Sequence, residues 1–265
     1  MRDWTTNGRP YISDKWKGKK KMRVYAKSDI GKVRNMNQDS FSVPVDNVEL
    51  KLYILADGMG GYKGGEIASR VAVTATEKYI KEKFYLLEKR DKKSIMKVIE
   101  DAIEFANTAI YEESEQDEEL QDMGTTIEVC LIYKNKVYIG HIGDSRIYQI
   151  RNNIMERVTT DHSYVEKLVR DGEITREESY THPKKNLLIK ALGTDEKAEP
   201  DLLDISIQKD DVLLICSDGL TNMIREDRIL EIVSENVETA IDNLIEEANK
   251  NGGLDNITVI IISNK

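Results

Sequence analysis

Residues 52–61 read Leu52-Tyr53-Ile54-Leu55-Ala56-Asp57-Gly58-Met59-Gly60-Gly61. The apolar run predicts a buried strand, and the aspartate that follows it is held at the end of a rigid element. The glycines allow a tight turn and leave the carbonyl of Gly58 uncovered. A carboxylate beside an exposed carbonyl oxygen suits a hard cation. A single Asp-Gly pair is also typical of an ordinary strand end, so the interpretation depends on whether the pattern recurs.

The pattern recurs in distant parts of the chain. Four more aspartates stand at the ends of apolar, strand-like runs: Asp39 before Phe41, Asp144 after Gly143, Asp218 before Gly219 and Asp255 before Ile257. Carboxylates gathered in one place repel one another unless positive charge lies among them. Five strand-end aspartates therefore predict one acidic site that holds two or more divalent cations.

The composition restricts the class of protein. The chain has 265 residues, 40% of them hydrophobic, which is enough for one large domain or two small ones with a buried core. The formal net charge of −9 argues against non-specific nucleic-acid binding. No apolar run approaches the roughly 20 residues of a membrane span, and no secretory signal opens the chain. Cys130 and Cys216 lie in apolar runs and are interpreted as buried, unpaired thiols. The cytoplasm is the simplest compartment.

The first 21 residues differ from the rest. They contain both tryptophans and the basic run Lys17-Gly18-Lys19-Lys20-Lys21, and Met22 offers a second start. We interpret residues 1–21 as an added or loosely ordered leader, and residues 22–265 as a single domain. The alternative is an arm that binds an acidic partner or a membrane surface.

The periodicity of the chain predicts many short strands and two clusters of helices. Helices are expected at 65–85, 94–115, 164–170, 227–234 and 237–249. Strands are expected at 23–26, 39–45, 50–56, 202–207, 212–216 and 256–263, with a meander of hairpins over 126–158. Hairpin-linked strands with clustered helices indicate an α+β protein rather than alternating βαβ units. The prediction is a β-sandwich with a pair of helices on each outer face.

Several common sites are excluded by their missing motifs. The glycines after Asp57 lack the Gly-Lys-Ser/Thr of a P-loop, and the three histidines form no HExxH pattern. No Gly-x-Ser-x-Gly elbow is present. A cysteine phosphatase needs a thiolate in an anion-binding loop, whereas both cysteines lie in apolar runs.

From Arg23 onward the chain resembles the metal-dependent protein phosphatase family, known as type 2C or PPM, and in particular its bacterial serine/threonine branch. The resemblance rests on an ordered series of short motifs. In chain order they are Arg34-Asn35-Met36-Asn37-Gln38-Asp39, Asp57-Gly58-Met59-Gly60-Gly61, Gly124-Thr125-Thr126, Gly143-Asp144-Ser145-Arg146, Asp161-His162-Ser163, Ala191-Leu192-Gly193, Ser217-Asp218-Gly219 and Asp255-Asn256. Each motif alone is weak, but the complete series in this order is specific.

The resemblance implies a sandwich of two antiparallel sheets with a binuclear Mn²⁺ or Mg²⁺ site at one end. It implies that Asp57 bridges two tightly bound metals, that the Gly58 carbonyl binds one of them, and that Asp39 binds directly or through water. The remaining implied ligands are Asp218 and Asp255 for the other tight metal, and Asp144 with Asp218 for a third, weaker one. Arg34 would hold the substrate phosphate.

The resemblance also implies a mobile flap over residues 161–192 that shapes substrate access. We take His162, Glu173 and Arg176 as its candidate functional residues. Animal and plant members often carry a histidine after the Asp-Gly pair, proposed as the general acid, whereas this chain has Met59. The acid is then either His162, if the flap brings it near, or a metal-bound water.

The activity implied is hydrolysis of phosphoserine and phosphothreonine in proteins by direct attack of a metal-bridging water. A cognate serine/threonine kinase is the expected partner, and the protein is expected to be a cytoplasmic monomer. Two alternatives stay open, a non-catalytic pseudophosphatase and a regulatory phosphatase dedicated to one partner. The five aspartates and Arg34 argue against the first, and the lack of room for a sensory domain argues against the second.

Overall fold

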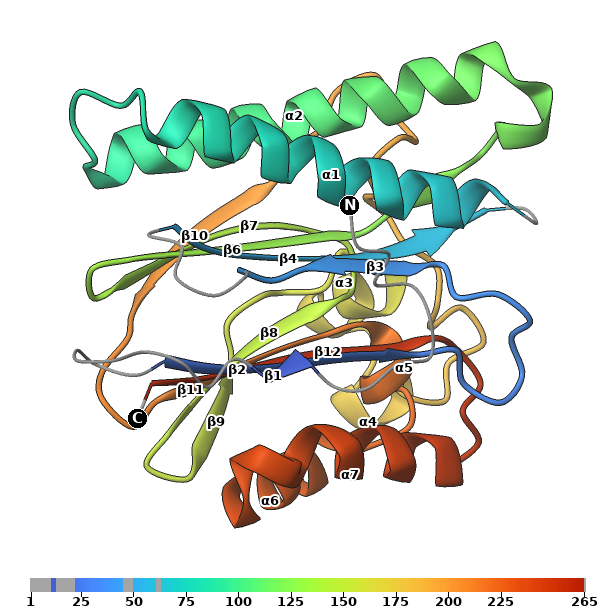
Figure 1. Ribbon diagram of the computed structural model, residues 1–265. Helices are drawn as coiled ribbons and strands as arrows, with labels where there is room; N and C mark the ends of the chain where they lie inside the picture. Colours follow the sequence, from blue (N-terminus) through green and yellow to red (C-terminus); the bar gives the residue numbers. More distant parts are fainter. Residues whose placement is uncertain (1–10, 13–21, 45–49, 61–62, 265) are drawn as a thin grey trace.

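The computed structural model describes residues 11–12, 22–44, 50–60 and 63–264, which form a four-layered α/β/β/α arrangement (Figure 1). All strand pairs are antiparallel. One sheet has the order β10 (Asp201–Ser206), β7 (Lys136–Ile142), β6 (Ile127–Tyr133), β4 (Lys51–Met59) and β3 (Asp39–Ser42), with the short β5 (Gly124–Thr125) beside β4. The other has the order β1 (Tyr11–Ile12), β2 (Met22–Asp29), β12 (Ile257–Asn264), β11 (Val212–Cys216), β8 (Arg146–Arg151) and β9 (Ile154–Arg157).

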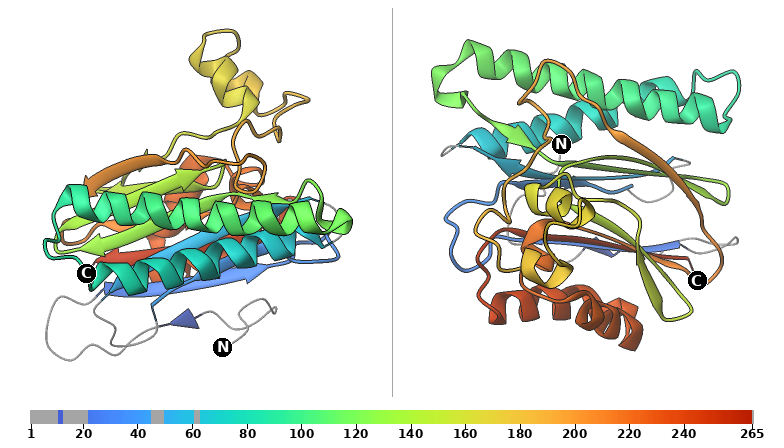
Figure 2. Two further views of the ribbon diagram at one scale, coloured as in Figure 1. Left: turned by 90° about the horizontal axis from the view of Figure 1, so that it is seen from above. Right: turned by 180° about the vertical axis from the view of Figure 1, so that it is seen from behind.

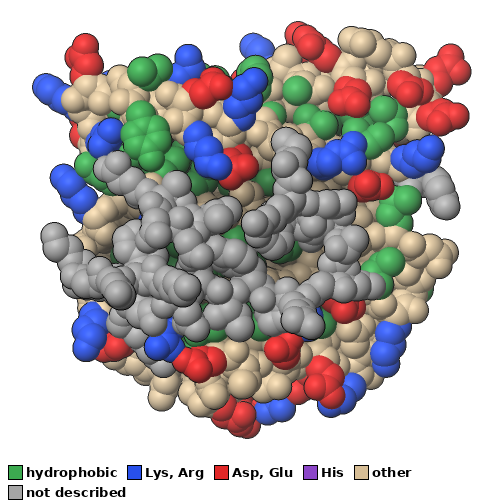
Figure 3. All heavy atoms as spheres, in the orientation of Figure 1, with side chains coloured by type: hydrophobic (Ala, Val, Ile, Leu, Met, Phe, Trp, Pro, Cys, Tyr) green, Lys and Arg blue, Asp and Glu red, His purple; other side chains and the backbone are tan. Residues whose placement is uncertain are grey.

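A pair of helices covers the outer face of each sheet. Helices α1 (Gly64–Phe84) and α2 (Lys92–Gln116) lie over the sheet of β4, and α6 (Glu226–Glu235) and α7 (Val237–Lys250) lie over the sheet of β11 (Figure 1). Three layers of apolar side chains result, one between the sheets and one under each helix pair. On the face seen in Figure 3, acidic and basic side chains are intermixed over the helical layers. The predicted α+β sandwich is confirmed.

The strand that carries Asp57 departs from the expected strand-and-turn pattern. β4 continues through Gly58 to Met59, and the turn comes at Gly60, whose φ is +128°. Gly58 is needed for a different reason, because an added Cβ would lie 2.0 Å from the carbonyl oxygen of Gly65 and 2.6 Å from that of Gln38. Similarly, Asp218 does not enter a turn but begins the short helix α5 (Asp218–Thr221).

The strands expected as one meander divide between the two sheets. β6 and β7 form a hairpin in the first sheet, and β8 and β9 form a hairpin in the second. The crossing falls at Gly143-Asp144-Ser145, where the chain bends between β7 and β8. The kink predicted from glycine is therefore the point at which the chain changes sheet, which brings Asp144 to the edge shared by both sheets.

The leader and the flap contain short ordered elements. Tyr11 and Ile12 pair with Ala26 and Tyr25 of β2, and the rest of residues 1–21 lies outside the described residues. The flap, residues 161–192, holds α3 (Tyr164–Arg170) and α4 (Arg176–Ser179) and extends away from the sandwich (Figure 2). Outside these layers lies the 3-10 turn η1 (Glu118–Leu120).

Two predictions about composition hold in the described part of the chain. Cys130 and Cys216 are buried free thiols, and burial raises the pKa of both well above the usual value. Neither is thus activated as a nucleophile. Among the described residues, no helix has the length and apolar character needed to cross a membrane.

Candidate metal centre

The five predicted aspartates meet at one end of the sandwich, where the two sheets join. Asp39 begins β3 and is the register partner of Asp57 in β4. The other three lie at the β7–β8 crossing, at the start of α5 and just before β12. A cavity of about 250 Å³ is lined by four of them, Asp57, Asp144, Asp218 and Asp255, together with Arg34, Gln38, Gly58, Met59, Gly60, Thr126, Asn186 and Leu188.

The carboxylates of this cluster raise one another's pKa. Burial and then the charges of Asp39, Asp218, Asp144 and Asp255 raise the pKa of Asp57 well above its usual value. Burial and the charges of Asp218 and Asp161 do the same for Asp144. For Asp218, burial and the charge of Asp255 raise the pKa to about 6. The mutual repulsion inferred from the sequence is therefore present in the structure.

The hydrogen bonds of Asp39 indicate whether a cation fits the acidic cluster. Its Oδ2 accepts hydrogen bonds from Ser217 Oγ at 2.9 Å and Thr258 Oγ1 at 2.6 Å, both from the opposite sheet. Its Oδ1 is buried and has no hydrogen-bond partner. A buried carboxylate oxygen without a donor is costly, and burial raises the pKa of Asp39 to about 7. A divalent cation bound to the cluster would supply the missing positive charge.

In this structure two of the other carboxylates accept hydrogen bonds from protein side chains. Arg34 Nη2 donates to Asp255 Oδ2 at 2.7 Å, and Asn222 Nδ2 donates to Asp218 Oδ2 at 2.8 Å. Accordingly, within the described ranges no three His, Cys, Asp or Glu side chains stand at the spacing of a formed metal site. The donor set still fits a specific group of metals, since clustered carboxylate oxygens with a backbone carbonyl favour Mg²⁺ or Mn²⁺ over zinc.

Two residues that received no role in the sequence analysis support the cluster. Thr126 Oγ1 accepts from the backbone N–H of Asp57 at 3.0 Å and lies 2.9 Å from Ser145 Oγ, so it links the ends of β4 and β8. Asn256 accepts from Gln38 N–H at 2.8 Å and donates to the carbonyls of Ile30 and Met36 at 3.0 Å. Both residues stand in quoted motifs, but only the fold shows that they bridge separate segments.

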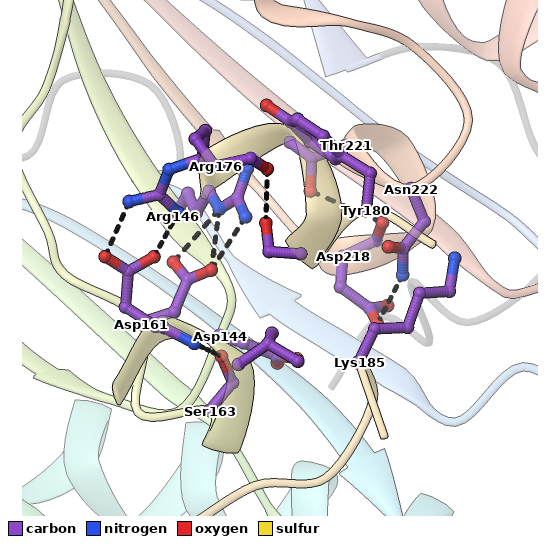
Figure 4. Close-up of a pocket in the computed structure, with 13 residues that line it drawn as sticks. Asp144, Arg146, Asp161, Ser163, Arg176, Tyr180, Lys185, Asp218, Thr221 and Asn222 are labelled. Atoms are coloured by element: carbon purple, nitrogen blue, oxygen red, sulfur yellow. Dashed lines mark hydrogen bonds and ion pairs between the residues drawn. The ribbon is translucent and has the colours of Figure 1, made fainter. Parts of the chain in front are cut away.

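The three candidate flap residues lie apart from the cavity lining. His162 is buried and turned toward Gly143, Glu173 is exposed, and Arg176 donates to Glu166 Oε1 at 2.8 Å. The flap contributes Asn186 and Leu188 to the cavity instead. Arg176 lines a smaller neighbouring cavity of about 40 Å³, which shares Asp144 and Asp218 with the larger one (Figure 4). That position places Arg176 beside Asp144 and Asp218, and its side chain is 44% exposed.

The comparisons with known proteins agree with this geometry. Residues 32–252 match the family model described as Protein phosphatase 2C. The chain is 38% identical over 248 residues to a serine/threonine phosphatase stp of Listeria innocua, covering 91% of this chain and 95% of the relative. The chain therefore belongs to the protein phosphatase 2C family, and the family prediction is confirmed.

Solved structures show the same fold. The serine/threonine phosphatase of S. agalactiae superposes with a TM-score of 0.84 at 35% identity, covering 92% of this chain and 100% of that one. The catalytic domain of the phosphatase PstP, solved in complex with two manganese ions, gives a TM-score of 0.80 at 33% identity, covering 91% and 97%.

Proposed function

We propose that this protein is a metal-dependent protein serine/threonine phosphatase. The observation that carries the proposal is the cavity in which four carboxylates from distant segments meet Arg34. Carboxylates that raise one another's pKa form a poor site for an anionic phosphate until cations are present. Membership of the protein phosphatase 2C family and a relative solved with two manganese ions support the same conclusion.

The metal ligands are assigned from position and burial. Asp57, the Gly58 carbonyl, Asp218 and Asp255 would hold two Mn²⁺ or Mg²⁺ ions, with Asp39 acting directly or through water from beneath. Asp144 with Asp218 would hold a third ion more weakly. When bound, such ions neutralise the carboxylates, offset the charge of a phosphate and make water nucleophilic near neutral pH.

Arg34 binds the substrate phosphate in this proposal. Its side chain is 48% exposed at the cavity and is paired with Asp255, so its guanidinium can be reached from solvent. A guanidinium can hold two phosphate oxygens at once, which orients the phosphorus toward the cluster. The pairing with Asp255 keeps the guanidinium beside the cluster before a substrate enters.

In this proposal, a water held at the metal centre would supply the proton for the leaving oxygen. Met59 lines the cavity and has no proton to give. His162 faces Gly143 with one ring nitrogen and Asp201 with the other, so it is not the general acid. Of the two candidates for the acid, the proposal therefore takes the metal-bound water rather than His162.

The substrates are proposed to be phosphoserine and phosphothreonine residues of other proteins, including a cognate kinase, and the enzyme to act as a cytoplasmic monomer. The support is the family and the serine/threonine phosphatases among its similar proteins. A pseudophosphatase is disfavoured because four of the five aspartates and Arg34 line one cavity, and the fifth, Asp39, is the register partner of Asp57. A phosphatase dedicated to one partner would share the chemistry and differ only in its range of substrates.

The test is hydrolysis of phosphopeptides by the purified protein. We expect phosphate release from phosphothreonine and phosphoserine peptides with Mn²⁺ or Mg²⁺, and none with a chelator or from a phosphotyrosine peptide. Arg34→Lys keeps the charge but loses the two-pronged geometry, and should raise KM for the phosphopeptide. Tight Mn²⁺ binding without turnover would identify a pseudophosphatase.

A further inference from the structure

The turn that carries Asp144 is confined on both sides. Gly143 has a φ of +115°, and a Cβ added there would lie 2.4 Å from the side chain of Thr126. Only glycine fits such a position without strain. Thr126 in turn accepts from Asp57 N–H, so one wall of the turn is the strand end that carries Asp57.

The other wall of the turn is His162. The backbone N–H of His162 donates to the Gly143 carbonyl at 2.7 Å. The backbone N–H of Gly143 donates back to the ring Nδ1 of His162 at 3.2 Å. Both polar backbone groups of Gly143 therefore end on one residue, which begins the flap.

This contact defines the tautomer of His162. A nitrogen that accepts from Gly143 N–H presents a lone pair, so the proton of the neutral ring lies on Nε2. That nitrogen faces Asp201 Oδ2 at 3.2 Å, where a donor is needed. Burial and the neighbouring His141 lower the pKa of His162, which favours the neutral ring.

The ring of His162 rests on a fixed platform. His141 lies beneath it with ring centroids 4.6 Å apart. The Nδ1 of His141 lies 2.5 Å from Glu128 Oε1, and its Nε2 lies 2.9 Å from the carbonyl of Thr160. Glu128, His141 and Asp201 are register partners on the adjacent strands β6, β7 and β10. These residues at the end of one sheet therefore fix the direction in which Nδ1 of His162 points.

We propose that His162 is a positioning residue of this phosphatase, which holds the Gly143 turn so that Asp144 faces the metal centre. Hydrogen bonds that orient a metal ligand from behind commonly affect metal affinity or activity by about 10- to 100-fold. The inference rests on the role of Asp144 proposed above. It also gives the first flap residues a role, since they are part of the support of the metal site.

Two substitutions distinguish the effect of losing the hydrogen-bond acceptor of His162 from the effect of losing its ring. In His162→Asn the amide oxygen can take the place of Nδ1, whereas His162→Leu leaves the Gly143 N–H without a partner. We expect His162→Leu to weaken the weaker class of Mn²⁺ sites by at least about tenfold in calorimetry and to lower kcat comparably. His162→Asn should stay within about threefold of the parent in both. Asp201→Ala, which removes the partner of Nε2 at a more exposed position, should show a smaller loss of the same kind.

His182→Leu is the matched control. His182 also belongs to the flap, and its Nδ1 accepts from Lys184 N–H at 3.1 Å, but it does not touch the Gly143 turn. Its substitution should leave Mn²⁺ affinity unchanged. Asp144→Ala, measured in parallel, tests the underlying assignment: retention of the weaker Mn²⁺ class there would overturn the role of Asp144. If Asp144→Ala loses that class while His162→Leu keeps it, the positioning role of His162 is wrong.

Discussion

The metal centre and the base of the flap both bury carboxylates, but the two regions differ in how far arginines compensate that burial. At the flap base, Arg146 donates to Asp161 at 2.7 Å, and Arg157 approaches Glu166 at 3.1 Å. For Glu166, burial raises the pKa, but hydrogen bonds from Arg176 and the charge of Arg157 outweigh it and lower the pKa to about 2. In the metal centre, burial and like charges raise the pKa of every aspartate for which a shift is resolved.

This difference shows which property of a buried carboxylate indicates function. Both groups are taken out of water, and both would be costly without compensation. At the flap base, three arginines pair with Asp161 and Glu166, so these buried charges are compensated within the protein. Figure 4 shows Arg146, Arg176 and Asp161 of this group. In the metal centre, Arg34 pairs with Asp255 and the charge of Arg146 acts on Asp144 and Asp218, yet the pKa of both aspartates stays raised. A bound cation would supply the remaining compensation.

The largest effect is expected from Asp57→Asn. The substitution removes one charge and one ligand oxygen at the centre of the cluster while preserving shape, so Mn²⁺-dependent turnover should fall by several orders of magnitude. Without metal, the variant should melt at a higher temperature than the parent, because repulsion among the carboxylates is relieved. Activity assays and thermal melts with and without Mn²⁺ provide the measurement.

Asp218→Asn should behave in the same way and serves as the parallel case. Mn²⁺ should raise the melting temperature of the parent by linkage and do much less for either variant. A variant that retains turnover near that of the parent, without dependence on Mn²⁺, would show that the acidic cluster is not the metal centre.

A smaller effect is expected from Glu166→Gln. It should lower the stability of the metal-free protein, whereas Asp57→Asn should raise it. Removing this charge leaves Arg157 and Arg176 without their shared partner, which should destabilise the flap by about 2 kcal/mol. Turnover of a phosphopeptide should change severalfold while p-nitrophenyl phosphate is nearly unaffected, since the flap borders the cavity without holding the cluster. Arg176→Ala should reproduce this result, and the exposed Glu173→Gln should not. Equal effects on both substrates would contradict the separation of the two regions.

The two regions should also respond oppositely to pH. Carboxyls whose pKa is raised in the folded state, to about 7 for Asp39 and about 6 for Asp218, take up protons on folding. Their contribution to stability is therefore lost as pH rises from about 4 to 7. Since Mn²⁺ competes with these protons, the rise in melting temperature that it causes should be larger at pH 7.5 than at pH 5.5. An equal rise at both values would argue against protonated carboxyls in the centre.

In the same melts, the contribution of Glu166 to stability should depend on pH in the opposite direction. Its pKa is lowered, so its contribution is complete above about 4.5 and is lost as pH falls toward 2. Acid melting below pH 4.5 should therefore be less steep for Glu166→Gln than for the parent.

Much of the centre could be predicted because aspartates at strand ends are visible in a linear pattern. Asp57, Asp144, Asp218 and Asp255 were all inferred in this way, and the structure places them around one cavity. The partners of these residues could not be predicted, because they come from segments far apart in the chain. Asp39, for example, is held by Ser217 and Thr258, which belong to the opposite sheet.

The flap was harder to predict for a physical reason. The flap was expected to be mobile, whereas Glu166 at its base is buried between two arginines. Charged residues in a sequence do not indicate whether their partners are water or one another. The role of His162 depended in the same way on Gly143, which lies 19 residues away and on another strand end.

The smallest effect is expected from deleting residues 1–21, which provides a baseline for both regions. In the described part of this leader, β1 pairs with β2 through Tyr11 and Ile12, while β2 pairs with β12 along its whole length. Losing β1 should cost about 1 kcal/mol of stability. The value of kcat/KM on a phosphopeptide should stay within about tenfold of the parent, or ~1.4 kcal/mol.

Deleting only residues 1–10 keeps β1 and serves as the control for that small stability loss. Because neither deletion changes the charges of the metal centre or of the flap base, the Mn²⁺-induced rise in melting temperature and its dependence on pH should be those of the full chain. A loss of kcat/KM beyond tenfold on deleting residues 1–21, with Mn²⁺ binding intact, would show that the leader contacts the substrate. A loss of Mn²⁺ stabilisation would show instead that the strand order β1-β2-β12 transmits strain to Asp255, which directly precedes Asn256 and β12.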